Sequence, residues 1–484
     1  MKNLSRRVFM RNSSLTAIAL MLSKNSFAQL PTDYTYFSIA EVSELIRLKK
    51  VSPVELVRTC LKRIELLNPK LNAFITVTGD IALKEAKLAE KEIANGKWKG
   101  PLHGIPIALK DNIDTAGIKT TAGSGVYKDR IPTEDAEVTT LLRNAGAISL
   151  GKLNMHEFAY GTTSIVSYFG SVQNPWNRDY IAGGSSGGSA VAVAAGLCYA
   201  AMGTDTGGSA RLPPACCGVT GLKATYDLIS IRGIIPLVKS MDHACPICRT
   251  VEDTAIMLNA ISAQALQPNN CKTDYRKYFN STQNPRIGIV QNLKISDSVY
   301  TSFKAAIATF RSLNCKMSEL ELPLTPQSMV TVFNAEVEAF HKPLIQQYKE
   351  LYDPVTIERF NGIKEVNSIE YINARNEMHE NRRTISDQLF KGLDVIILPT
   401  TLTPPLTIAD AKVKGPRALA VDCTIPFNYY GLPAISIPCG FTNEGLPLGL
   451  QIVGPKFGEN KVLVVANKFQ KATNWHLRHP DTSY

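Results

Sequence analysis

From residue 103 onward, short apolar runs alternate with segments of helical spacing, and this alternation restricts the fold more than any other feature. Strands are predicted at 105–109 and 147–150, with helices at 137–145 and 189–195. A chain that alternates in this way buries its strands in a parallel or mixed sheet and covers them with helices. The sequence therefore predicts an α/β fold. Further apolar runs predict strands at 286–290, 394–398, 434–438 and 448–453.

The segment before this alternation is predicted to be helical. Ser38 and Ser52 each stand three residues before a glutamate, which is the pattern of a capping box. Apolar residues then recur at helical spacing from Val57 to Leu67, and Asn68-Pro69 is expected to end that helix. Residues 80–94, rich in alanine and lysine, are expected to form another helix.

The chain is long enough for a large core, with 484 residues of which 44% are hydrophobic. No linker-like stretch divides it, although residues 330–387 are more polar and helical in rhythm. We therefore expect residues 29–484 to form a single domain.

Residues 1–28 have the pattern of a cleavable export signal. Paired arginines in Ser5-Arg6-Arg7-Val8-Phe9 resemble the twin-arginine signal of bacteria, and Ser26-Phe27-Ala28 is a small-x-small cleavage site. The apolar stretch 15–22 is too short to span a bilayer, which needs about 20 residues. We predict cleavage after Ala28, a periplasmic or secreted protein exported through the twin-arginine route, and no membrane anchor.

The positive net charge does not indicate a nucleic-acid partner. The formal charge is +11, but five of the 53 basic residues and none of the 42 acidic residues lie in 1–28. The rest of the chain carries an excess of only six basic residues, spread along its length. A scattered excess of this size is typical of a solvated surface, and no nucleic-acid binding is expected.

Three short segments contain residues suited to nucleophilic catalysis. Gly183–Ser189 and Gly203–Arg211 are runs of small residues that allow unusual backbone geometry and expose N–H groups near a serine. Lys110 ends the predicted strand at 105–109. A lysine whose head is desolvated has a lowered pKa, and it can then act as the base that a serine nucleophile needs.

Together these segments resemble the amidase signature family. Leu102–Asp111 resembles the family's lysine segment, Asn174-Pro175-Trp176 with Gly183–Ser189 its glycine–serine signature, and Gly203–Lys223 its nucleophile segment. The C-terminal stretches 431–438 and 445–451 are also typical of the family. The resemblance runs from about Ser38 to the C-terminus. It implies a central twisted mixed β-sheet flanked on both sides by α-helices.

The resemblance also implies catalytic roles. Ser209 is expected to be the nucleophile that forms an acyl-enzyme, and Ser185, beside a cis peptide bond, the bridging serine. Lys110 is expected to take the proton through Ser185 and return it to the leaving amine. The oxyanion hole is expected to come from the backbone N–H groups of Thr206, Gly207, Gly208 and Ser209.

The remaining expectations concern the ligands. Ala159 and Gly161 are expected to line the acyl pocket, and Asp205 and Arg211 to support the nucleophile loop. The reaction implied is hydrolysis of a small-molecule or peptide amide to a carboxylate and ammonia or an amine, with no metal and no organic cofactor. The identity of the amide stays open.

Three alternatives compete with this interpretation. Gly183–Gly187 fits the G-x-S-x-G elbow of α/β-hydrolase esterases, which requires a strand before Ser185 and a catalytic histidine. The same family also contains the amidotransferase A-type subunit, which supplies ammonia for amidating transfer-RNA-linked glutamate or aspartate; an export signal argues against it. A non-catalytic binding protein would be expected to have lost Lys110, Ser185 or Ser209, and all three are present.

Two further motifs are expected to be structural. His156 is predicted to be a structural polar residue rather than a base. Cys245-Pro246-Ile247-Cys248 is a single C-x-x-C with no second pair at zinc-ligand spacing, so it is expected to be neither a metal nor a redox site.

Overall fold

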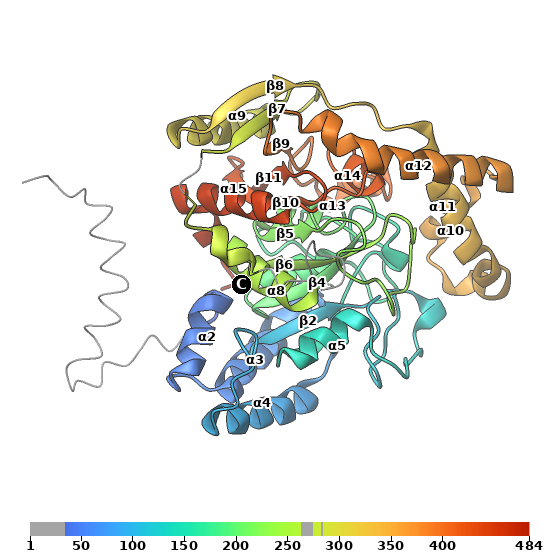
Figure 1. The fold of residues 1–484 in the computed structure, drawn as a ribbon. Coiled ribbons are helices and arrows are strands. Elements are labelled where there is room, and N and C mark those ends of the chain that lie inside the picture. The colour runs from blue at the N-terminus through green and yellow to red at the C-terminus, as the bar shows by residue number, and fades with distance from the viewer. Residues whose placement is uncertain (1–33, 263–273, 282–283, 484) are drawn as a thin grey trace, which may run out of the picture.

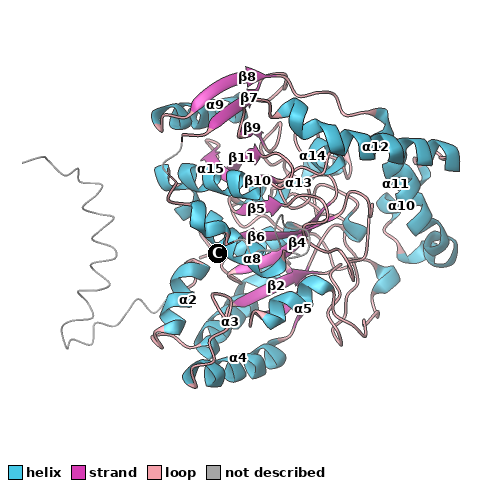
Figure 2. Cartoon of the chain, viewed as in Figure 1, coloured by secondary structure: helices cyan, strands magenta, loops and turns pink. Residues whose placement is uncertain are grey.

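The computed structural model describes residues 34–262, 274–281 and 284–483. The predicted signal at 1–28 lies outside the described residues. In Figure 1 the strands follow one another through the middle of the molecule, and helices surround them. The colouring by element in Figure 2 shows the same arrangement of a central sheet with helical layers. No helix of the described part of the chain is long and apolar enough to cross a membrane.

The strands form one mixed sheet of 11 strands in the order β1-β3-β2-β4-β6-β5-β10-β11-β9-β7-β8. Parallel pairs join β2 to β3 and β4, and β7 to β8 and β9, whereas the pairs in the middle of the sheet are antiparallel. The strands are β1 (Phe74–Val77), β2 (Pro106–Lys110), β3 (Ile148–Leu153), β4 (Ala200–Asp205), β5 (Thr220–Lys223), β6 (His243–Cys248), β7 (Arg286–Val290), β8 (Lys316–Leu320), β9 (Val395–Pro399), β10 (Ala434–Phe441) and β11 (Pro447–Val453).

Helices cover both faces of this sheet. The helices are α2 (Ile39–Arg47), α3 (Pro53–Leu71), α4 (Gly79–Ala94), α5 (Glu137–Asn144), α6 (Gly187–Ala194), α7 (Leu212–Cys217), α8 (Val251–Ile261), α9 (Asp297–Ser312), α10 (Gln327–Tyr348), α11 (Pro354–Asn361), α12 (Ser368–Leu389), α13 (Ile408–Lys414), α14 (Ile425–Tyr429) and α15 (Glu459–Ala472). α6 packs on α7, and α7 on β10 and β11; α15 packs on the same two strands and on α8. The predicted α/β fold with a mixed sheet between helical layers is confirmed.

The six strands predicted from apolar runs are all present as β2, β3, β7, β9, β10 and β11, with small shifts of their ends. The predicted end of the second helix is wrong. α3 continues through Pro69 to Leu71, which is fully buried, and ends at Asn72 in the left-handed conformation. Burial of Leu71 extends the last turn, and a proline there removes only one hydrogen bond near the helix end.

The parallel part of the sheet positions the chemistry. β2 and β4 are neighbours that run in the same direction, with Leu109 opposite Met202. Their carboxyl ends, at Lys110 and Asp205, therefore meet at one edge of the sheet. This edge is where α/β sheets commonly bind their ligands.

Candidate active site

Lys110 lies at the carboxyl end of β2, where its side chain is completely buried. Its Nζ donates hydrogen bonds to Oγ of Ser185 at 2.8 Å and to Oγ1 of Thr204 at 2.7 Å. Nδ2 of Asn112 also donates to the Thr204 hydroxyl, at 3.2 Å. Both partners of the lysine are neutral hydroxyls, so no carboxylate stabilises its ammonium form by direct contact.

This environment favours an uncharged lysine. Burial lowers the pKa of Lys110 to about 7, and the more distant charges of Asp205 and Asp242 oppose that shift without cancelling it. Near neutral pH a large fraction of Lys110 therefore carries a free lone pair. A neutral amine at 2.8 Å from a serine hydroxyl is placed to accept its proton.

Ser185 lies in the turn that leads into α6. The Gly184–Ser185 peptide bond is cis, which agrees with the cis bond expected beside this serine. Gly184 is required by packing, because a Cβ there would lie 2.5 Å from the backbone N of Thr163. The glycine run thus lets the chain pass close to its neighbours while holding the Ser185 hydroxyl against Lys110.

Ser209 follows β4 in the loop before α7, and 7% of its surface is exposed. The backbone N–H of Ser186 donates to the carbonyl oxygen of Ser209 at 3.3 Å, so the two serine segments are in direct contact. Lys110 and Ser185 are fully buried and do not line the cavity described below, whereas Ser209 does. The structure thus joins Lys110 to Ser185 by a side-chain hydrogen bond and brings the segment of Ser185 against that of Ser209 through the backbone.

A buried ion pair holds the nucleophile loop. Nε and Nη2 of Arg211 donate to the two carboxylate oxygens of Asp205, each at 2.9 Å, and both side chains are fully buried. Burial alone would raise the pKa of Asp205, but the charge and hydrogen bonds of Arg211, together with a hydrogen bond from Asn428, hold it well below its usual range. Arg211 also donates to Oε1 of Gln451 at 2.7 Å. These contacts tie the loop to β11 and α14, as expected of supporting residues.

One of the predicted oxyanion-hole donors is already engaged. The Gly208 N–H donates to Oδ1 of Asp205 at 2.7 Å, so it is not free for a substrate oxygen in this structure. Gly208 has a φ of +135°, and a Cβ there would lie 2.4 Å from Oγ1 of Thr424. Its role is to let the loop turn tightly. The N–H groups of Thr206, Gly207 and Ser209 remain the predicted donors of the oxyanion hole.

Thr206, in the loop between β4 and α7, is held by a hydrogen bond from its side chain to Asp242. Its hydroxyl donates to Oδ1 of Asp242 at 2.5 Å, and the same carboxylate accepts the N–H groups of Leu237 and Val238. Burial raises the pKa of Asp242 to about 6. Asp242 therefore connects Thr206, in the loop after β4, to Leu237, and both residues line the cavity.

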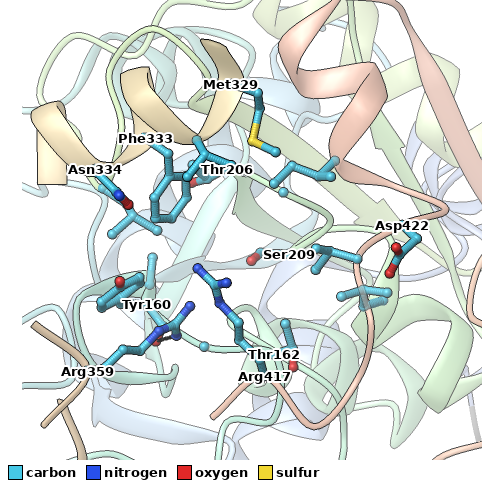
Figure 3. A pocket seen from close by; sticks show the side chains of 18 residues that line it. Tyr160, Thr162, Thr206, Ser209, Met329, Phe333, Asn334, Arg359, Arg417 and Asp422 are labelled. Carbon is cyan, nitrogen blue, oxygen red and sulfur yellow. Dashed lines mark hydrogen bonds between the residues drawn. The ribbon is translucent and has the colours of Figure 1, made fainter. Parts of the chain in front are cut away.

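A cavity of about 230 Å³ opens in front of Ser209 (Figure 3). Ala159 and Gly161, predicted to line the acyl pocket, lie in its wall beside Thr206 and Gly207. Its other lining residues are Tyr160, Thr162, Leu212, Leu237, Met329, Val330, Phe333, Asn334, Arg359, Arg417, Val421, Asp422 and Ile425. A small, partly apolar cavity with a serine at its base is suited to a small amide.

Two arginines in this cavity were not predicted from the sequence. Figure 3 shows the side chains of Arg359 and Arg417 beside each other, with Asp422 on the other side of Ser209. Arg359 lies over the ring of Tyr160, 3.5 Å from its centroid, and donates to the Tyr160 carbonyl. Burial, together with the nearby charge of Arg417, lowers the pKa of Arg359 to about 10. Both arginines lie far from the signature segments in sequence, and no motif marks them.

Thr204 and Asn112 were also missed, although Thr204 bonds to Lys110 directly and Asn112 bonds to the Thr204 hydroxyl. Thr204 lies within the segment identified as the nucleophile loop, and Asn112 lies two residues after Lys110. Its place after the small and apolar residues 200–203 of β4 could have indicated Thr204, because a hydroxyl in a buried strand needs a partner.

The esterase alternative does not fit the structure. No strand precedes Ser185, since residues 174–184 form turns with only isolated β-bridges. The Ser185 hydroxyl accepts from a lysine instead of a histidine. His156 is buried, and burial lowers its pKa to about 3; its Nδ1 accepts the N–H of Ser164, as expected of a structural residue.

The C-x-x-C motif lies within β6, where Cys245 and Cys248 are three residues apart. Residues three apart on a strand point to opposite faces of the sheet, so these two thiols cannot bind the same ion. The cysteines within the described residues are all buried and free of disulfides. In the same part of the chain, no group of three or more His, Cys, Asp or Glu residues could hold a metal ion.

Comparison with known proteins assigns the chain to a family. The family model described as Amidase matches residues 55–463. The chain belongs to the Amidase family. This amidase is 39% identical over 481 residues to the A-type subunit of the glutamyl-tRNA(Gln) amidotransferase of Methylococcus capsulatus, covering 92% of this chain and 98% of that relative.

Solved structures show the same relationship. The peptide amidase from Stenotrophomonas maltophilia has a TM-score of 0.82 to this amidase and is 29% identical, covering 94% of this chain and 100% of that one. A second solved amidase has a TM-score of 0.80 at 29% identity, covering 90% and 99%. The chain is a hydrolase that acts on amide bonds, and the resemblance found in its sequence is confirmed.

Proposed function

We propose that this enzyme hydrolyses a carboxamide through an acyl-enzyme on Ser209, with Ser185 and Lys110 as the proton relay. The observation that supports this most directly is the hydrogen bond of 2.8 Å between a fully buried Lys110 and Ser185, whose segment bonds through the Ser186 N–H to Ser209, a serine that lines the cavity. A solvated lysine would be protonated and unable to accept a proton at neutral pH.

In the proposed first half-reaction, neutral Lys110 accepts the proton of the Ser185 hydroxyl while Ser185 takes the proton of Ser209. The Ser209 oxygen forms a bond to the substrate carbonyl carbon, and the negative charge on the carbonyl oxygen is stabilised by the N–H groups of the loop. The protonated Lys110 returns the proton through Ser185 to the amine nitrogen as the C–N bond breaks. Water then attacks the ester by the same relay and releases the carboxylic acid.

The nucleophile is tested by replacing Ser209 with alanine and measuring ammonia and amine release from a panel of amides. We expect turnover to fall by at least about three orders of magnitude, as it does when a serine nucleophile is removed. Ser312→Ala is the matched control, since Ser312 is exposed at the end of α9. Full activity in the Ser209→Ala enzyme would show that another group attacks the amide.

A second candidate function comes from the relatives that are A-type subunits of glutamyl-tRNA(Gln) amidotransferases. Under that alternative the same site would release ammonia for transfer to transfer-RNA-linked glutamate or aspartate. The two functions differ in their dependence on partners. We expect the purified chain alone to turn over amides at a rate that added transfer RNA and amidotransferase partners do not change; strong stimulation by them would favour the alternative.

We also propose that residues 1–28 direct export through the twin-arginine route, so that the substrate is an amide outside the cytoplasm. The support is the sequence pattern of paired arginines, short apolar stretch and small-x-small site. Replacing Arg6 and Arg7 with lysine should keep the protein in the cytoplasmic fraction, with Lys2→Arg as control. Mature protein that begins at Met1 in the periplasm would contradict cleavage after Ala28.

A further inference from the structure

Two buried side chains beside the nucleophile loop are not used by the proposed proton relay. Lys223 is the last residue of β5 and is fully buried, and His243 is the first residue of β6, with 4% of its surface exposed. His243 is the cross-strand partner of Asp205, the last residue of β4. The loop that carries Ser209 begins directly after Asp205. Both side chains therefore lie close to the point where this loop leaves the sheet.

The neighbours of the His243 ring determine which of its nitrogens carries the proton. Nδ1 lies 2.7 Å from the carbonyl oxygen of Met241 and 3.2 Å from that of Asp205. A carbonyl oxygen can only accept a hydrogen bond, so Nδ1 is the protonated nitrogen. Burial, and then the charge of Lys223, lower the pKa of His243 well below its ordinary value, so the ring is neutral. Nε2 therefore has a lone pair and needs a donor.

Lys223 supplies that donor. Its Nζ lies 3.4 Å from Nε2 of His243, and it donates to the carbonyl oxygens of Leu432 at 2.5 Å and Ala224 at 3.0 Å. Burial, and then the charge of Arg211, lower the pKa of Lys223 to about 7, and nearby carboxylates act against that shift. Three acceptors around Nζ favour the ammonium form, because it has three N–H bonds to donate whereas the neutral amine has two.

The carbonyl group of Asp205 belongs to the same planar peptide group as the N–H of Thr206. A rotation that moves the carbonyl oxygen therefore moves this N–H as well. The oxygen is held by two donors, Nδ1 of His243 and, at 3.0 Å, Nδ2 of Asn428. Because the peptide bond is trans, the Thr206 N–H points away from both donors. Thr206 itself lines the cavity in front of Ser209.

We propose that His243 is a positioning residue for the oxyanion hole. By binding the Asp205 carbonyl, it fixes the direction of the Thr206 N–H, and Lys223 holds the ring in the tautomer that does so. A hydrogen bond accepted by the carbonyl also polarises the peptide group, which makes its N–H a stronger donor. This inference rests on the proposed function, in which the Thr206 N–H stabilises the oxyanion. Since Asn428 holds the same carbonyl, loss of His243 should weaken the oxyanion hole without abolishing it.

The first test compares His243→Phe with His243→Asn on the amide that the wild type hydrolyses fastest. Phenylalanine keeps a ring but cannot donate, whereas the amide nitrogen of asparagine can take the place of Nδ1. We expect His243→Phe to lower kcat about tenfold with KM little changed, because the oxyanion forms only in the reaction; loss of a whole donor costs about two to three orders of magnitude. His243→Asn should recover most of this loss. His476→Phe, at a half-buried histidine after α15, is the matched control and should keep full activity.

A trifluoromethyl ketone analogue of the same substrate separates positioning from damage to the fold. It adds to Ser209 and forms an oxyanion in the place of the one formed in the reaction. Its affinity for His243→Phe should fall by about the same factor of ten as kcat does. If the ketone instead bound with unchanged affinity to a smaller fraction of active enzyme, the role of His243 would be structural and the proposal would be wrong.

Nitrogen NMR of the His243 ring in the wild type measures the tautomer without relying on any variant. We expect Nδ1 to be protonated and Nε2 to be an acceptor, with the Nε2 resonance in Lys223→Met moving toward that of a nitrogen without a hydrogen bond. A proton on Nε2, or an Nε2 resonance that does not move, would overturn the proposal.

Failure of this inference can be distinguished from failure of the proposed function. An unchanged kcat in His243→Phe would refute the positioning role while the wild type still hydrolysed amides. If the wild type hydrolysed none of the amides in the panel, the proposed function would fail, and this inference with it.

Discussion

Replacing Lys110 with methionine should make the protein inactive and, below neutral pH, more stable. Methionine has a similar length and needs no hydrogen-bond partner, so it can fill the same buried space. In the wild type, burial lowers the pKa of Lys110 from 10.5 to about 7. The folded state therefore binds the lysine proton less tightly than the unfolded state does.

The size of the effect follows from this difference in pKa. At about 1.4 kcal/mol for each pH unit between 10.5 and 7, the wild type loses about 5 kcal/mol of folding free energy. This cost is fully present below pH 7 and decreases as the pH rises toward 10.5, where the unfolded lysine also loses its proton. The variant gives up two hydrogen bonds, to Ser185 and Thr204, worth about 1 kcal/mol each. It should be more stable than the wild type by about 3 kcal/mol at about pH 6, and about equally stable at about pH 9.

Urea unfolding at a series of pH values measures this difference directly. Lys87→Met, which changes an exposed lysine on α4, is the control and should show no pH-dependent difference from the wild type. The reasoning would be refuted if Lys110→Met were destabilised by the same amount at both ends of the pH range. That result would mean that the lysine is charged and well solvated inside the fold.

The other predictions concern the groups around the relay. Ser185→Ala should lower kcat by about two to four orders of magnitude, measured by ammonia release, because the proton path to Lys110 is interrupted. Thr204→Val should reduce kcat by about tenfold without changing KM, since Lys110 keeps its bond to Ser185 but loses its second partner. Asp205→Asn should destabilise the protein by about 3–5 kcal/mol in urea unfolding, because it leaves the Arg211 charge buried without a carboxylate. An unchanged kcat in Ser185→Ala or in Thr204→Val would contradict the role assigned to that residue. An unchanged free energy of unfolding in Asp205→Asn would contradict the role of the buried ion pair.

The strands and the catalytic segments could be predicted because their signals are local. The apolar run at Arg286–Val290 predicted a strand, and β7 begins and ends at these two residues. The prediction succeeds because a buried parallel strand is apolar on both faces. Lys110, Ser185 and Ser209 each stand in a short segment whose glycines or apolar neighbours mark it. The end of α3 was missed because burial of Leu71 outweighed the local preference of proline, and burial depends on contacts with distant residues.

The residues that shape the cavity could not be predicted for the same physical reason. Arg359 and Arg417 belong to α11 and to the loop after α13, and only the folded chain places them beside Ser209. The engagement of the Gly208 N–H by Asp205 is likewise a property of the folded loop. A motif can indicate which loop supplies an oxyanion hole, but the individual donors depend on how the loop's own carboxylate is bonded.

The central claim is that an uncharged Lys110 draws the proton from Ser209 through Ser185. Its most direct test is the pH dependence of acylation of Ser209, followed in a single turnover by release of a chromogenic amine from an anilide. The pKa of about 7 for Lys110 predicts that the rate rises about tenfold per pH unit below pH 7 and becomes constant above it. A rate that is constant from about pH 5 to 8, or that rises only near pH 10, would contradict the relay.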